Sequence, residues 1–169
     1  MFAKKLAAAL LAVTAVASSA YAQSPTRIEQ FKAWGSYFYQ GNPGKVCYVL
    51  TVPEEKQKTP PNVDHGNVFF LVTQRPGQNI SYEPQAMLGY DLQAGSKVTV
   101  IVDNKQFIMF TKGRSAWLEN AAEEPALVAA MRSGHAMSMG AVSKKGTKTG
   151  YVFSLAGISA ALKNIETCK

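Results

Sequence analysis

The sequence contains few of the residues from which catalytic and metal sites are usually built. Its 169 residues include two histidines and two cysteines, and these form no cluster at the spacing that a zinc site requires. The nucleophile motif G-x-S-x-G and the phosphate-loop motif G-x-x-x-x-G-K-[ST] are both absent. We therefore expect no metal, no cofactor and no catalytic residues, and we interpret the chain as a protein that is not an enzyme.

Long hydrophobic runs are also missing, apart from a short one near the N-terminus. Lys4 and Lys5 precede the apolar run 6–16, and small residues ending in an A-x-A motif at Ala22 follow it. This layout is typical of a secretory signal peptide, here 1–22. The run is too short to cross a hydrocarbon core of ~30 Å, which disfavours an uncleaved anchor. We expect cleavage after Ala22 and a periplasmic or secreted mature chain.

Composition and charge limit the partners of the mature chain. Hydrophobic residues make up 47% and charged residues 17%, which suits one folded domain over residues 23–169. The formal charge is +7, and Lys4 and Lys5 leave with the signal peptide. The remaining excess permits peripheral contact with an anionic membrane surface, lipopolysaccharide or acidic glycans, and it equally permits no role beyond solubility. Nucleic acid is not an expected partner, because the chain is exported and its charge is modest.

The two cysteines, Cys47 and Cys168, both lie in the mature part of the chain. An even count in an oxidising compartment predicts a disulfide, which would tie the C-terminus to an early strand. The alternative, a redox-active pair, is disfavoured because the C-x-x-C spacing that lowers a thiol pKa is absent.

Short runs rich in β-branched and aromatic residues, separated by turn residues, predict a domain built mainly of strands. We expect strands at 27–39, with a break allowed at Gly35, and at 45–52, 68–74, 79–82, 86–88, 97–102, 106–111, 135–143 and 148–154. Asp103-Asn104-Lys105 tolerates positive φ and should join its flanking strands as a hairpin. Residues 53–67 contain three prolines, which cannot donate to a strand ladder, so we expect a surface loop there.

Two segments after Trp117 follow helical spacing. Residues 123–132 start with acidic residues and stop before Ser133-Gly134. Residues 156–165 carry apolar side chains at helical intervals after a capping Ser154. Many short strands with two short helices in the C-terminal half favour an antiparallel β-sandwich or a flattened barrel.

Short motifs spread over nearly all of the mature chain resemble one known family. They are Trp34, CYV at 47–49, Pro53, GY at 89–90, GRSAW at 113–117, LVAAM at 127–131, SKKGT at 143–147, SLAG at 154–157 and AAL at 160–162. In this order they are similar to the invasion-associated locus B family, exported proteins of Gram-negative, mainly alphaproteobacterial, cells. The resemblance implies an exported protein associated with the cell envelope, in a family named for a role in host-cell entry, with Cys47 and Cys168 as its paired cysteines. It implies no established reaction.

A lysine-rich turn is the strongest candidate for a binding site. Lys144, Lys145 and Lys148 surround Gly146, so their ammonium groups and nearby backbone N–H groups could face a phosphate or carboxylate. Lys112 and Arg114 would enlarge this basic patch if the fold brings them near. The alternative is a charged hairpin tip that prevents edge-to-edge aggregation.

The two histidines have simpler interpretations than catalysis. His65 falls in the proline-rich segment and is expected to be a solvated loop residue rather than a metal ligand or general base. His135 opens a strand just past a helix end, where a cation is favourable, and a structural role is expected.

Clustered aromatic and methionine side chains are expected to pack in the protein interior. The aromatic group could instead line a ligand groove, but core and cross-strand packing is the commoner role. The residues concerned are Trp34, Tyr37, Phe38, Tyr39, Met137 and Met139.

Export, a disulfide, a basic turn and no catalytic set together favour a non-enzymatic protein that binds an envelope or host-surface component. One alternative is an envelope hydrolase or isomerase with a site assembled from scattered residues, which requires a pocket of converging polar groups around His65 or His135. The other is a structural or chaperone-like envelope factor, which requires a large exposed apolar patch.

The signal peptide gives a direct prediction. When the full chain is expressed in a Gram-negative host, the exported protein should begin at Gln23, because Ala22 ends the small-residue cleavage motif. Intact-mass measurement of the purified protein checks this. A mass that includes residues 1–22 would contradict it.

Overall fold

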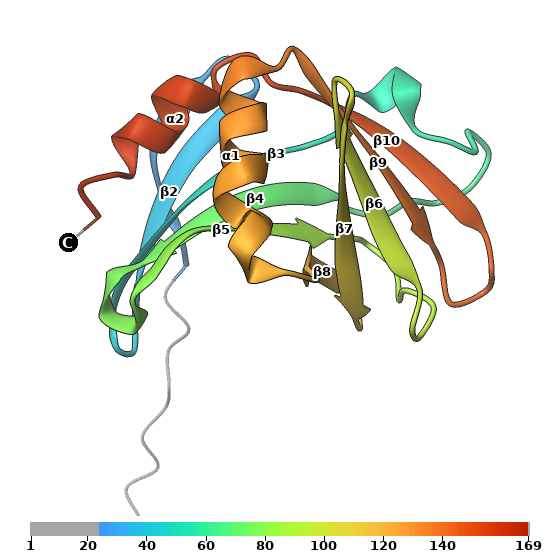
Figure 1. Ribbon diagram of the computed structural model, residues 1–169, viewed down its shortest axis with the longest axis horizontal. Coiled ribbons are helices and arrows are strands. Elements are labelled where there is room, and N and C mark those ends of the chain that lie inside the picture. The colour runs from blue at the N-terminus through green and yellow to red at the C-terminus, as the bar shows by residue number, and fades with distance from the viewer. Residues whose placement is uncertain (1–23, 169) are drawn as a thin grey trace, which may run out of the picture.

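Across residues 24–168, which the computed structural model describes, ten antiparallel strands form one continuous sheet (Figure 1). The strands are β1 (Thr26–Phe31), β2 (Trp34–Gly41), β3 (Gly44–Thr51), β4 (Phe69–Arg75), β5 (Ile80–Met87), β6 (Lys97–Val102), β7 (Lys105–Lys112), β8 (Ser115–Leu118), β9 (Ala136–Val142) and β10 (Lys148–Ser154). Their order is β1-β2-β3-β4-β5-β8-β7-β6-β9-β10, so β1 and β10 are the two edges. The expected signal peptide and its cleavage site lie outside the described residues.

Two helices cover the concave face of the bent sheet (Figure 1). Helix α1 (Glu124–Ser133) packs on β5 and β6, and α2 (Ile158–Asn164) packs on β1, β2 and β3. Three short 3-10 turns, η1 (Glu55–Gln57), η2 (Pro76–Gln78) and η3 (Ala121–Glu123), lie in the connections. The apolar faces of both helices join the inward side chains of the strands in one core. This hydrophobic burial is the main stabilising contribution to the fold.

The fold class predicted from the sequence is confirmed. The domain is mainly antiparallel β with two helices in its C-terminal half, and the ten strands form one sheet that is not closed. The hairpin predicted around residues 103–105 is also confirmed, with Val102 paired to Lys105. Asp103 adopts a φ of +52° there, a conformation that Asp and Asn tolerate better than most residues.

Two of the expected strand boundaries are wrong. Residues 27–39 form two strands, and the break falls at Lys32, where φ is +54°, rather than at Gly35. Hydrogen bonds from Thr51 and to Ala156 hold the backbone of Ala33 in this turn. Residues 79–82 and 86–88 belong to one strand, β5, which includes Pro84. A proline is tolerated there because β8 pairs with residues 85–87 of β5, which leaves the strand without a neighbour on that side at Pro84.

The buried Trp34 links segments that lie far apart in the sheet order. Its side chain is fully buried, and its indole N–H donates to the carbonyl of Ser154 at the end of β10 (3.0 Å). Beside it, the N–H of Ala33 donates to the carbonyl of Ala156 (3.2 Å). The start of β2 and the end of β10 therefore meet, although the sheet itself stays open.

The packing roles expected for the aromatic and methionine residues are confirmed. Met137 and Met139 are buried, as Trp34 is. Tyr37 stacks on Tyr48 of the neighbouring strand with ring centroids 5.3 Å apart. Phe38 packs against the core, and Tyr39 meets the same Tyr48 ring edge-on.

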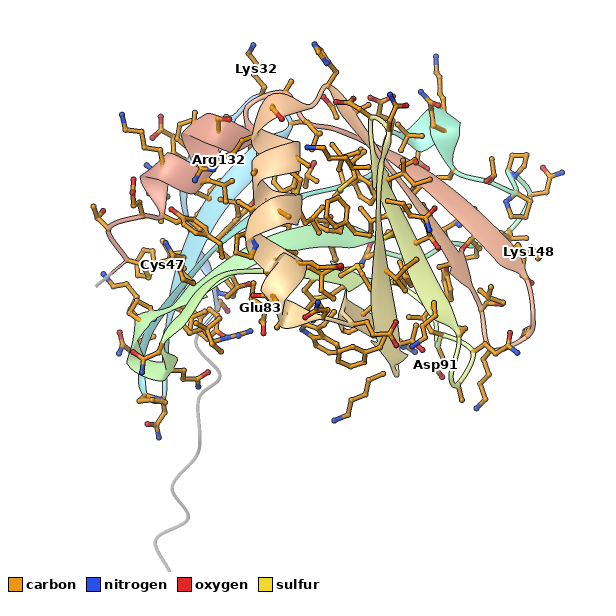
Figure 2. All side chains as sticks on the ribbon, viewed as in Figure 1. Lys32, Cys47, Glu83, Asp91, Arg132 and Lys148 are labelled. Carbon is orange, nitrogen blue, oxygen red and sulfur yellow. A yellow bond between two sulfur atoms is a disulfide. The ribbon has the colours of Figure 1, made fainter. Side chains whose placement is uncertain are left out.

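A disulfide fastens the end of the chain to β3. The Sγ atoms of Cys47 and Cys168 are 1.96 Å apart, and both residues are buried. The amide of Gln74 on β4 donates to the carbonyl of Ile165 (3.2 Å), which fixes the same segment from a second strand. Figure 2 shows Cys47 and Lys148 on opposite sides of the molecule, so the disulfide lies far from the lysine-rich turn.

Removal of the disulfide should destabilise the domain strongly. The variant Cys47→Ser/Cys168→Ser should lose about 5 kcal/mol of unfolding free energy, because the bridge closes a loop of 121 residues in the unfolded chain. Urea unfolding of the variant and the wild type measures the difference, and the reduced wild type serves as the matched control. A loss below about 1 kcal/mol would contradict the assigned role.

Candidate functional site

The segment between β3 and β4 lies along the edge of β10. The N–H of Glu54 donates to the carbonyl of Val152 (2.8 Å), and Thr59 exchanges two backbone hydrogen bonds with Gly150 (2.9 and 3.0 Å). These bonds cover part of an edge strand that would otherwise expose unpaired backbone groups. They also position the rest of the segment so that His65 lies over Tyr151, in the middle of β10.

His65 is buried, which corrects its interpretation as a solvated loop residue. The residue exposes only 7% of its surface to solvent. The Nε2 atom lies 2.9 Å from the carbonyl oxygen of Pro60, and Nδ1 lies 2.9 Å from the hydroxyl of Tyr151. The sequence could not show this burial, because the partner strand β10 is 86 residues further along the chain. His135, in contrast, is exposed at the start of β9.

A chain of hydroxyl groups continues from His65. The hydroxyl of Tyr151 lies 2.9 Å from that of Tyr90, and the Tyr90 hydroxyl lies 2.6 Å from Oγ1 of Thr149. Burial raises the pKa of both tyrosines. Both phenols therefore keep their protons near neutral pH, and the chain consists of hydroxyl donors and acceptors.

Three residues of this chain, His65, Tyr90 and Thr149, form one wall of a hollow of about 430 Å³, which we call the lysine pocket. Segments far apart in sequence meet around it: the end of the β3–β4 segment, the turn after β5, the turn between β9 and β10, and β10 itself. The lining residues are Val63, Asp64, His65, Tyr90, Asp91, Ser143, Lys144, Lys145, Thr147 and Thr149. A second hollow of about 330 Å³ shares residues 63–65 with the lysine pocket. Its other lining residues are Glu55, Lys56, Lys58, Pro61 and Gly66.

Hydrogen bonds hold the lysine-rich turn, which contributes lining residues to the lysine pocket. Within the turn, the N–H of Gly146 donates to the carbonyl of Ser143, and the N–H of Thr147 donates to Ser143 Oγ. Gly146 has a φ of +84°, which favours glycine at this position. The N–H of Lys144 donates to the carbonyl of Asp91 (2.8 Å), so the turn is also fixed to the segment after β5.

The five basic residues proposed from the sequence do not all line the lysine pocket. Lys144 and Lys145 line the lysine pocket, whereas Lys148 is exposed at the start of β10 and does not line it. Arg114 reaches the pocket indirectly, through its ion pair with Asp91 (3.1 Å). Lys112 lies in a separate hollow of about 410 Å³ on the outer side of β7 and β8, lined by Glu83, Phe110, Lys112, Trp117, Leu118, Ala121 and Glu124.

Two lysines and two aspartates line the lysine pocket, and Arg114, which is paired with Asp91, adds one positive charge beside it. Within residues 24–168, neither Lys144 nor Lys145 forms an ion pair with a carboxylate. Of the two acidic residues that line the pocket, Asp91 is paired with Arg114, and Asp64 accepts a hydrogen bond from the N–H of Gly66 (2.8 Å). Two lysines without carboxylate partners among residues 24–168 therefore line the pocket together with hydroxyl side chains.

Sequence reasoning missed the hydroxyl-lined wall. Its one local signal was the alternation in β10, where Thr149 and Tyr151 stand two residues apart and therefore share a face. Both are buried, which is unusual for polar groups unless they have hydrogen-bond partners. Tyr90 sits in a turn, and nothing local connects it to β10.

Neither a metal-binding cluster nor a membrane-spanning helix is present in residues 24–168. Residues 24–168 hold no group of three His, Cys, Asp or Glu side chains arranged to bind a metal ion. Neither helix in this range has the length and apolar character that a membrane crossing requires.

A curved antiparallel sheet with two helices and a buried disulfide defines a disulfide-stabilised β domain. The family model described as invasion associated locus B (IalB) protein matches residues 39–166, so the chain belongs to this family. The disulfide and the family both indicate an exported protein.

A solved structure supports the same fold. The crystal structure of invasion associated protein b from Bartonella henselae matches with a TM-score of 0.55 and 15% sequence identity, covering 81% of this chain and 94% of that chain. At this identity the match shows a shared fold. The comparison with curated proteins found no match.

The hydroxyl chain should contribute to stability as well as to the pocket wall. Tyr151→Phe removes the hydroxyl between His65 and Tyr90 and leaves buried polar atoms unpaired, which should lower the unfolding free energy by about 1–3 kcal/mol. Tyr39→Phe, on a half-buried ring of β2, is the matched control and should change stability by less than about 0.5 kcal/mol. Urea unfolding measures both, and equal effects would contradict the assigned role of the chain.

Proposed function

We propose that this IalB-family protein is a periplasmic or secreted binding protein, trimmed of its signal peptide, that holds an anionic group of an envelope or host-surface component in the lysine pocket. One observation carries the proposal: Lys144 and Lys145, both free of carboxylate partners among the described residues, converge with hydroxyl groups on a hollow of about 430 Å³. This volume lies within the range of small-ligand pockets, about 300–1,000 Å³.

The composition of the lysine pocket favours an acidic sugar unit as its ligand. Ammonium groups bind phosphate, sulfate or carboxylate through charge-assisted hydrogen bonds. Ser143 and Thr147 supply hydroxyls that can both donate and accept, as sugar hydroxyls require. The carboxylates of Asp64 and Asp91 can accept hydrogen bonds from the same ligand. A simple anion would use the lysines alone.

The geometry around His65 favours binding over catalysis. Both ring nitrogens already have partners, Nε2 in the carbonyl of Pro60 and Nδ1 in the hydroxyl of Tyr151. A general base needs a nitrogen within hydrogen-bond reach of the proton that it removes. A pocket does lie at His65, as the hydrolase or isomerase alternative requires. Neither ring nitrogen of His65 is free to act as a general base there.

The chaperone-like alternative receives less support. The most exposed large apolar side chains come from separate strands and loops rather than one segment. They are Ile28, Val52, Val63, Met87, Ile101 and Phe110. A host or envelope partner also agrees with the name of the Bartonella henselae structure, an invasion associated protein.

The proposal is tested by calorimetric titration of the mature protein with glucose 6-sulfate and with glucose. The sulfated sugar should bind, and Lys144→Glu/Lys145→Glu should weaken its affinity at least about tenfold, because a hydrogen bond to a charged group contributes about 1.5–3 kcal/mol. Lys105→Glu/Lys163→Glu makes the same charge change at exposed lysines on β7 and α2, and it should leave the affinity unchanged.

Two outcomes would contradict this assignment. Equal affinity of the two lysine double variants for the sulfated sugar would show that Lys144 and Lys145 do not bind it. Failure to bind the sulfated sugar, combined with binding to phosphatidylglycerol vesicles, would favour contact with an anionic membrane surface instead.

A further inference from the structure

We propose that anion binding in the lysine pocket is coupled to the uptake of one proton by His65, through the hydroxyl chain that Tyr151, Tyr90 and Thr149 form. This inference rests on the proposed function, since it concerns the same pocket. His65 lines the pocket itself, and Tyr151 acts as a positioning residue, because it reaches the ligand site through Tyr90 and Thr149.

The first step is the proton arrangement on His65. Its Nε2 atom lies 2.9 Å from the carbonyl oxygen of Pro60, which can only accept, so Nε2 carries a proton. In the neutral ring, Nδ1 then has no proton and must accept one from its partner, the hydroxyl of Tyr151 at 2.9 Å. The neutral histidine therefore fixes the direction in which Tyr151 donates.

The second step is a count of protons along the chain. Four links run from His65 through Tyr151, Tyr90 and Thr149 to the carbonyl of Ala141, the last at 3.3 Å. The three hydroxyls supply three protons. With His65 neutral, these protons fill the first three links, all donated toward His65. The longest link, from Thr149 to Ala141, is then left without a proton.

Protonation of His65 completes the chain. The fourth proton sits on Nδ1, so His65 donates to Tyr151, and each hydroxyl reverses its direction in turn. Thr149 then donates to the carbonyl of Ala141, and all four links hold a proton. The buried imidazolium thus has a partner at each nitrogen, which reduces the cost of placing its charge in the interior. The tyrosines contribute no ionisation of their own, because burial raises the pKa of each.

The acidic groups around His65 are largely occupied. The carboxylates that line the two hollows beside it are Glu55, Asp64 and Asp91. Glu55 pairs with Lys58 (2.6 Å), and Asp91 pairs with Arg114 (3.1 Å). Asp64, the nearest in sequence, therefore remains as the acidic group that favours a charged His65.

The basic groups around His65 oppose a further positive charge in the empty pocket. Lys56, Lys144 and Lys145 line the hollows, and none of them forms an ion pair with a carboxylate within residues 24–168. An anion bound between Lys144 and Lys145 offsets this repulsion and attracts the imidazolium. Because such coupling is reciprocal, a charged His65 must strengthen anion binding by the same factor.

Binding that takes up one proton strengthens as pH falls, by no more than about tenfold per pH unit. We therefore expect the affinity for the anion to be higher at pH 5.5 than at pH 7.5.

Calorimetry of the mature wild-type protein with glucose 6-sulfate, which keeps its charge over this range, tests the proposal. Titrations at both pH values, in two buffers of different ionisation enthalpy, give the affinity and the number of protons taken up. His65→Asn should abolish the pH dependence, whereas His135→Asn, at the exposed second histidine, should retain it. Tyr151→Phe should reduce it, because the substitution removes the first two links of the chain.

A second measurement on the wild type does not depend on whether the variants fold. Nitrogen NMR of the imidazole should show a proton on Nε2 alone at pH 7.5, and protons on both nitrogens at pH 5.5 with the sulfated sugar bound. Equal affinity at both pH values, no proton uptake, or a neutral ring protonated at Nδ1 would each overturn the coupling. No binding at either pH would instead overturn the proposed function, and the coupling with it.

Discussion

The backbone pairing between the β3–β4 segment and the edge of β10 is the constraint on which the site depends. Three hydrogen bonds, from Glu54 to Val152 and between Thr59 and Gly150, attach a proline-rich connection to a strand from the far end of the chain. That attachment places His65 over Tyr151 and creates the floor of the lysine pocket. Without it, β10 would be an open edge, and His65 would be the solvated residue that its local sequence suggests.

The molecule separates the features that hold it together from those that we assign to binding. Trp34 and the Cys47–Cys168 disulfide join chain segments around the core, and Cys47 lies on the side away from Lys148 (Figure 2). The lysine pocket is instead formed by connections between strands, which rest on a rigid sheet. Such connections can vary in sequence without loss of the fold. This arrangement agrees with a family in which a 15% identical structure keeps the same architecture.

Local patterns in the sequence predicted those parts of the structure that local interactions determine. The hairpin at residues 103–105, helix α1 and the buried face of β9 follow from turn chemistry and periodicity. The division of residues 27–39 did not, because Thr51 and Ala156 hold the turn at Lys32. The lysines were found from the local sequence of the turn around Gly146. The hydroxyl groups beside them come together because Tyr90 meets β10 across about 60 residues. Lys112 lies in a different hollow because of the position of β7 in the sheet.

The location of the ligand site is the central claim, and chemical-shift mapping tests it most directly. Backbone amide spectra of the mature protein are recorded during titration with glucose 6-sulfate. The account predicts the largest shifts at the lysine pocket, in residues 143–149 and around Tyr90, with little change near Phe110 and Trp117. Shifts concentrated in the hollow that holds Lys112, with residues 143–149 unaffected, would contradict it.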